Sequence, residues 1–162
     1  MATLNDAITE YNAQLQKGQN QIAYKGIMTF MSRLKTALES SHPDYSVSGL
    51  YFGYMDMTYF AFTPLELKRR NLKIAIVYLH QENRFELWLG GSNRKIQAEY
   101  IDFFKGKDLG FFRLSKVSPG VDSIIESIIS EKPNFDDPAE LTNTIEKQTM
   151  GFAQKVHDLL LG

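Results

Sequence analysis

Two acidic residues, Asp56 and Glu86, lie inside segments that are otherwise rich in aromatic and apolar residues. Burying a carboxylate costs free energy unless it is paired or lies at an exposed turn. Glu86 alternates with Arg84 and Trp88, so these three side chains are expected on one face of a strand. Carboxylates on neighbouring strands can form an acid–base pair or hold a hard metal ion. The plainer alternative pairs Arg84 with Glu86 or Asp56 as a structural salt bridge.

The segment from Gly90 to Lys95 is a second candidate, for an anion-binding site. Gly91 permits close approach of the backbone where a strand is expected to end and a helix to begin. Free N–H groups and the positive end of the helix dipole collect at such a start, and Arg94 and Lys95 add positive charge. The spacing matches neither a P-loop nor a dinucleotide-binding fingerprint. The alternative is a tight turn with two solvated basic residues.

Other residue types narrow the possible chemistry. The chain has no cysteine, which excludes disulfides, thiolate metal sites and cysteine nucleophiles. The histidines, His42, His80 and His157, lack the i,i+4 pairing of a helical zinc site, and no Gly-x-Ser-x-Gly motif supports a serine nucleophile. We therefore predict no metal site and no cofactor, assign no catalytic residue, and favour a protein that is not an enzyme.

The net charge of −1 hides an uneven distribution. Residues 63–117 contain 11 Lys and Arg against 6 Asp and Glu, whereas residues 118–162 contain 3 against 8. Either the acidic part packs beside the basic part, or the basic part exposes a face to an acidic partner protein. A net charge this small argues against nucleic acid as a partner.

The periodicity of apolar residues predicts several amphipathic helices. Two are expected near the N-terminus, a third after the Gly90–Lys95 turn, and two more in the C-terminal part. The predicted helical ranges are 4–18, 20–40, 96–104, 118–129 and a last helix opened by Asp137 and Pro138.

Strands are predicted where aromatic and β-branched residues gather. The run 51–62 reads as a hairpin that reverses near Gly53 to Asp56. Residues 73–80 and 84–90 form a second hairpin, in which a turn at Glu82–Asn83 would place residue 79 opposite residue 86. A further strand is expected over 111–117.

These elements predict a single α+β domain over residues 1–162. Its sheet is mainly antiparallel, with about five strands flanked by amphipathic helices in the order ααββββαβαα. No window approaches the roughly 20 apolar residues of a membrane span, and the N-terminus does not read as a signal peptide. A cytoplasmic protein without membrane contact is expected.

The element order, with an acid on each of two central strands, resembles the restriction-endonuclease-like core. In that family the second acid is followed two residues later by a lysine, which orients the attacking water. Here Trp88 occupies that position after Glu86. The resemblance therefore implies a degenerate copy of the nuclease site.

The string Tyr-Met-Asp-Met-Thr-Tyr-Phe at residues 54–60 is similar to the hallmark of an uncharacterised bacterial family, labelled a domain of unknown function. The segments 72–77, 84–89 and 120–126 resemble it as well. The resemblance covers nearly the whole chain. It implies a single-domain soluble bacterial protein and carries over no activity, ligand or catalytic residue.

These observations favour a non-catalytic module that binds a small anionic ligand or a partner protein. The candidate binding residues are Asp56, Arg84, Glu86, Trp88, Gly91, Arg94 and Lys95. The alternative is a metal-dependent phosphoesterase, or a degenerate restriction-endonuclease-like domain, that uses Asp56 and Glu86.

Overall fold

A computed structural model describes all 162 residues and contains one six-stranded antiparallel sheet and five helices. The helices are α1 (Leu4–Gln16), α2 (Gln19–Ser41), α3 (Leu65–Arg69), α4 (Arg94–Phe104) and α5 (Pro138–Leu161). The strands are β1 (Tyr45–Val47), β2 (Met57–Pro64), β3 (Leu72–Leu79), β4 (Arg84–Gly91), β5 (Arg113–Leu114) and β6 (Ser123–Glu131). The predicted α+β class is confirmed.

The sheet has the strand order β1-β2-β3-β4-β6-β5, and every neighbouring pair is antiparallel. The central β3–β4 hairpin pairs Tyr78 with Phe85 and Val77 with Glu86. Because side chains alternate along a strand, Tyr78 and Phe85 point to one face, and Val77 and Glu86 point to the other. The two faces of the sheet are therefore chemically distinct.

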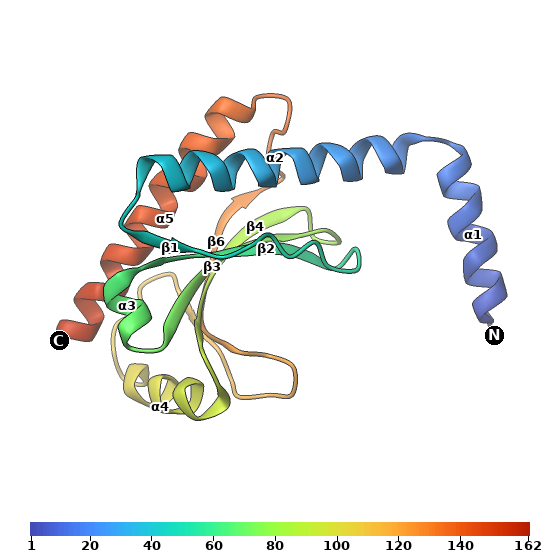
Figure 1. Cartoon of the computed structure of the whole chain (residues 1–162). Coiled ribbons are helices and arrows are strands. Elements are labelled where there is room, and N and C mark those ends of the chain that lie inside the picture. The colour runs from blue at the N-terminus through green and yellow to red at the C-terminus, as the bar shows by residue number, and fades with distance from the viewer.

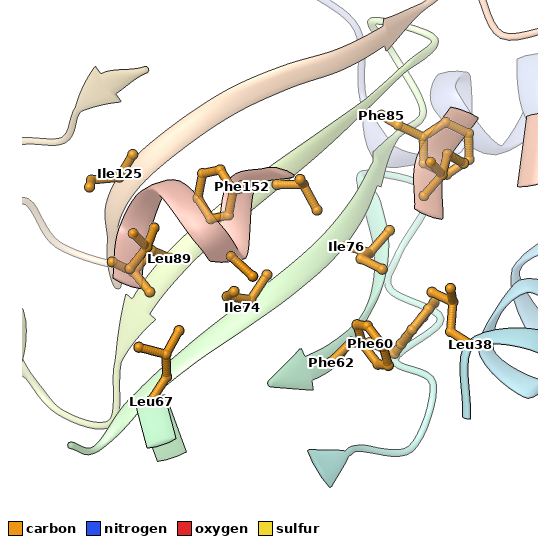
Figure 2. Close-up of a cluster of buried hydrophobic side chains, with 14 of the residues drawn as sticks. Leu38, Phe60, Phe62, Leu67, Ile74, Ile76, Phe85, Leu89, Ile125 and Phe152 are labelled. Atoms are coloured by element: carbon orange, nitrogen blue, oxygen red, sulfur yellow. The ribbon is translucent and has the colours of Figure 1, made fainter. Parts of the chain in front are cut away.

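The first face of the sheet carries the hydrophobic core (Figure 2). Phe60, Ile76 and Phe85 from three strands pack beneath α2, whose Leu38 is fully buried among them. Phe152 of α5 lies beside Ile74 and Leu89 (Figure 2). Burying each such side chain contributes about 1.5–3 kcal/mol, so this face holds the sheet and the long helices together.

The ends of the helices follow local capping chemistry. The side chain of Asp137 accepts a hydrogen bond from the backbone of Glu140, with Pro138 as the first helical residue of α5, as predicted. Asn93 caps α4 through the backbone of Ile96. Figure 1 shows α2 crossing the sheet and α1 standing apart at one end of the molecule. None of the helices combines the length and apolar character required to cross a membrane.

The predicted helix over 118–129 is wrong, because this segment contains strand β6. Its pairs of adjacent isoleucines fit a helical stripe as well as a strand with two buried sides. Pairing with β4 decides the outcome, and the register shift between Leu89 and Gly90 lets β6 place both Ile124 and Ile125 in the interior. β-Branched side chains favour this extended form.

The predicted β3–β4 register is also wrong, by two residues. Leu79 lies opposite Arg84 rather than Glu86, because the connection uses four residues, 80–83, with Asn83 at a positive φ of 52°. A shift of two residues keeps every side chain on its predicted face. The expected strand over 111–117 is confined to Arg113–Leu114.

Candidate functional site

The second face of the sheet holds a buried acid, Glu86, in the middle of β4. Its side chain is only 1% exposed, yet both carboxylate oxygens have partners. Oε2 accepts a hydrogen bond from Arg84 Nε at 2.6 Å, and Oε1 accepts one from Trp88 Nε1 at 2.9 Å. Arg113 Nη2 reaches Oε1 at 3.3 Å. Glu86 therefore accepts three hydrogen bonds, with at least one on each oxygen, and holds its neighbours in place.

Arg113 extends this arrangement from β4 to the neighbouring strands. The same Nη2 donates to Glu126 Oε1 at 2.7 Å, so one guanidinium bridges two carboxylates. Glu126 Oε2 accepts from Ser123 Oγ at 2.8 Å, and Ser123 is hydrogen-bonded to Ser115 at 2.9 Å. We call the connected side chains the Glu86 network; they are Arg84, Glu86, Trp88, Arg113, Ser115, Ser123 and Glu126. The network ties β4, β6 and the β5 region together.

Two irregularities in the ladder position the network. The pairing of β4 with β6 shifts between Phe85 and Glu86 and again between Leu89 and Gly90. Such bulges increase the local twist and redirect side chains. Between them Trp88 lies directly opposite Glu126, so the aromatic ring and the carboxylate share one face. The strand pairing thus places these two side chains together.

A hollow of about 250 Å³ lies on this second face, next to Trp88. Strands β2, β3, β4 and β6 and the loop at 120–122 line it, and no helix contributes. The lining side chains combine two aromatic rings with charged groups and small residues; the lining residues are Met57, Tyr59, Lys73, Ala75, Trp88, Gly90, Gly120, Val121, Asp122 and Glu126. A largely apolar wall with a few polar groups is typical of a site for a small molecule.

The charged groups of the hollow differ in how firmly they are held. Glu126 has both oxygens occupied within the Glu86 network. Lys73 Nζ lies 3.1 Å from Asp122 Oδ2, but these side chains are 40% and 60% exposed. Exposed ion pairs contribute at most about 1 kcal/mol, so the Lys73–Asp122 pair can separate at little cost. The hollow therefore has one firmly held wall and one adjustable ion pair.

Asp56 is not brought together with Glu86. It is exposed in the loop before β2, where its Oδ1 accepts the backbone N–H groups of Tyr54 and Met57 at 2.9 and 2.8 Å. These donors hold the pKa of Asp56 below its ordinary value. Strand β3 separates β2 from β4, so two strand spacings of about 4.8 Å already keep the acids about 10 Å apart.

The shared cleft required by the metal-dependent alternative is thus not formed by Asp56 and Glu86. The chain contains no group of three or more His, Asp or Glu side chains arranged to hold a metal ion. Asp56 instead stabilises its own loop.

The Gly90–Lys95 turn adjoins the hollow only through Gly90. A side chain at Gly91 would meet the backbone nitrogen of Gln97 at 2.8 Å, so Gly91 permits α4 to pack closely on β4. Arg94 Nη1 donates to the carbonyl of Ser118 at 3.3 Å, and Lys95 is exposed. The two basic residues therefore lie outside the lining of the hollow.

Several site residues were missed from the sequence. Arg113 and Glu126 join the network only because β5 and β6 pair, and a helix was predicted over most of β6. Lys73 and Asp122 lie 49 positions apart in the chain and meet across the sheet. No local signal places Glu126, because the spacing of Ser123, Glu126 and Ser127 matches one face of a helix rather than the alternation of a strand.

A larger hollow of about 1180 Å³ lies between α2 and the start of α5. Its lining includes Lys25, Arg33 and Asp136, none of which forms a side-chain ion pair. None of its lining residues belongs to the Glu86 network, which holds Trp88 in place. The hollow on the second face is therefore the better candidate site.

Comparison with known proteins places the chain in one family. No curated protein and no solved structure matches it. A family model described as "Domain of unknown function (DUF7000)" matches residues 4–160, which is nearly the whole chain. The chain therefore belongs to this family of domains of unknown function.

Proposed function

We propose that this protein is a small-molecule binding module whose ligand lies against Trp88 in the hollow of the second sheet face. One observation carries the proposal: the indole N–H of Trp88 is held by the buried Glu86, while its ring lines a 250 Å³ hollow. An aromatic wall that is already oriented loses little entropy when a ligand packs on it. Preorganisation of this kind favours binding.

The lining supports a particular class of ligand. Trp88 and Tyr59 offer apolar ring surface to a flat or ring-bearing group. The adjustable pair offers an ammonium at Lys73 and a carboxylate at Asp122. A ligand inserted between them would place an acidic group on Lys73 and a hydrogen-bond donor on Asp122. We therefore propose a small ring-bearing acid that also carries a donor group, which refines the anionic ligand expected from the sequence.

Three related probes test this assignment by ¹H–¹⁵N NMR titration at millimolar concentration. Phenylalanine carries ring, acid and amine; 3-phenylpropanoate lacks the amine; 2-phenylethylamine lacks the acid. We expect phenylalanine to shift the Trp88 indole resonance at the lowest concentration. If none of the three moves that resonance, the proposal is wrong, and stronger binding of 3-phenylpropanoate would favour a simple anion site instead.

A pair of matched variants locates the binding. Lys73→Met removes the ammonium in the hollow and keeps an unbranched side chain only one atom shorter, so binding of phenylalanine should weaken about tenfold, as expected for a lost charged hydrogen bond. Lys95→Met makes the same change at an exposed site outside the lining and should leave affinity unchanged. Equal effects of the two substitutions would contradict the assignment.

We also place this function in the bacterial cytoplasm. The resemblance noted for residues 54–60 supports a bacterial source, and a chain without cysteine suits a reducing compartment.

A further inference from the structure

Helix α1 is a well-formed helix that packs against almost nothing. Thr3 and Asp6 form a capping box with reciprocal hydrogen bonds of 2.9 and 3.1 Å, yet no residue of α1 is buried. Gly18, at a φ of +81°, separates it from α2, and Figure 1 shows it standing away from the sheet. Isolated helices shorter than about 12–15 residues are marginal in water, so a 13-residue helix needs a packing partner.

The uncovered side of α1 is apolar and faces further apolar residues. Tyr11 and Leu15 line a hollow of about 470 Å³ together with Tyr24 of α2, Met55 of the loop before β2 and His80. The same loop exposes Tyr54 to 89%. We call these exposed residues of helix and loop the N-terminal apolar face; they are Leu4, Ile8, Tyr11, Tyr51, Phe52, Tyr54 and Met55.

We propose that this face is the contact between two copies of the chain, in which α1 of each copy packs into the hollow of the other. Every copy has both the projecting helix and the hollow beside it. A two-fold axis therefore lets each helix pack into the hollow of the other copy, and the resulting dimer leaves neither surface free to bind a third copy. No residue of the N-terminal apolar face lines the hollow at Trp88, and the nearest connection is the ring of Tyr51, which lies 4.9 Å from the ring of Tyr59 in that lining.

The exposed area fits a stable dimer. The seven side chains are between 42% and 89% exposed. With about 200 Å² for each large side chain, they offer roughly 800 Å² per copy, which is the area that each partner buries in a standard interface. Exposed apolar patches of this size mark interaction sites in soluble proteins.

The charges of α1 favour a second copy over a lipid surface. Interfacial membrane helices carry Lys and Arg on their polar side, whereas the only charged residues of α1 are Asp6 and Glu10. If the two α1 helices cross antiparallel, the acidic half of one approaches Lys17 at the C-terminal end of the other. The acidic residues are thus complementary to the neighbouring segment of an identical chain.

Sedimentation equilibrium on the full chain tests the proposal. We expect a mass of about 37 kDa, twice the 18.5 kDa of one chain, with dissociation on dilution. Ile8→Glu places a charge in the apolar stripe of α1. It should raise the protein concentration at which half of the dimer dissociates at least tenfold. Tyr54→Glu alters a side chain that is 89% exposed, so it should weaken the dimer with no effect on folding of the monomer.

Ala13→Glu is the matched control, because it adds the same charge at an exposed position of α1 on the side away from Ile8. We expect its dimer to dissociate as the wild type does. A monomer at every concentration would overturn the proposal. A dimer that resists both Ile8→Glu and Tyr54→Glu, or that Ala13→Glu weakens equally, would overturn it too.

Discussion

Glu86 shows how one buried acid can be structural although its residue type suggests chemistry. A carboxylate that is 1% exposed and accepts hydrogen bonds from Arg84, Arg113 and Trp88 has no free oxygen for a substrate. Its role in the fold is to hold Trp88 and the two guanidinium groups in place, and in the proposed function it would affect a ligand only through the ring of Trp88. The sequence identified the residue and its neighbours on the strand, and the partners from β5 determine what it does.

Glu86→Gln should lower the free energy of unfolding by about 2–3 kcal/mol. The amide keeps the shape of the side chain but cannot satisfy two guanidinium groups and an indole N–H, and hydrogen bonds to charged groups contribute about 1.5–3 kcal/mol. Urea unfolding followed by the fluorescence of Trp88, the only tryptophan, measures the change. Asp122→Asn is the control: its ion pair is exposed, so the effect should stay below about 1 kcal/mol. Equal losses would contradict the central role of Glu86 in its network.

His80 should make stability depend on pH. Burial lowers its pKa below the ordinary value of 6.5, and Thr58 Oγ1 and the stacked ring of Tyr24 surround it. The unfolded chain therefore binds a proton at a higher pH than the folded protein does. The free energy of unfolding should be maximal above about pH 6.5 and fall as the pH drops toward the lowered pKa.

Urea unfolding from about pH 8 to about pH 5 tests this dependence on protonation. In His80→Gln the decline should be shallower, because the titrating group is gone. A decline of the same slope in the variant would show that other groups are responsible.

At the scale of elements, local patterns predicted most helices and the faces of the strands. The buried stripe of α2 and the buried face of the β3–β4 hairpin follow from periodicity. The start of α5 follows from the capping residue Asp137 and from Pro138. The β3–β4 register was not predicted because it depends on the length of the connection at 80–83, and β6 was not predicted because it depends on pairing with the distant strand β4. The same dependence hid Arg113, Glu126 and Asp122 from the predicted site. Predicting the site needs the strand order, which periodicity alone does not supply.

Gly91→Ala should destabilise the junction of β4 and α4. The added methyl group would lie 2.8 Å from the backbone nitrogen of Gln97, and overpacking of this kind costs about 1–3 kcal/mol. Gly151→Ala is the control, since its site within α5 is open and alanine favours a helix by about 0.5–1 kcal/mol. In thermal unfolding, the midpoint temperature should fall for Gly91→Ala and rise for Gly151→Ala. A Gly91→Ala protein as stable as the wild type would contradict the close packing.

At the scale of the whole molecule, the uneven charge of the chain is partly neutralised within the fold. Lys73 and Arg113 of the basic part pair with Asp122 and Glu126 of the acidic part. This supports the interpretation that the two parts pack side by side. Docking of an acidic partner on the remaining basic residues stays a prediction.

The proposed dimer predicts how α1 exchanges its amide hydrogens. A helix without buried residues should exchange quickly in a dilute solution of monomers, and packing into a second copy should slow it. Hydrogen exchange of residues 4–16 should therefore slow as the protein concentration rises, whereas the core strands β3 and β4 stay equally protected. Exchange in α1 that is independent of concentration would contradict this assembly.

The most direct test of the proposed binding site is the indole N–H of Trp88, because this one group joins the buried Glu86 to the hollow. A hydrogen–deuterium NMR experiment should find it protected in the free protein, and titration with phenylalanine should move its resonance toward saturation. Rapid exchange of this proton would contradict its hydrogen bond to Glu86. A resonance that none of the three probes displaces would contradict the proposed ligand site at Trp88.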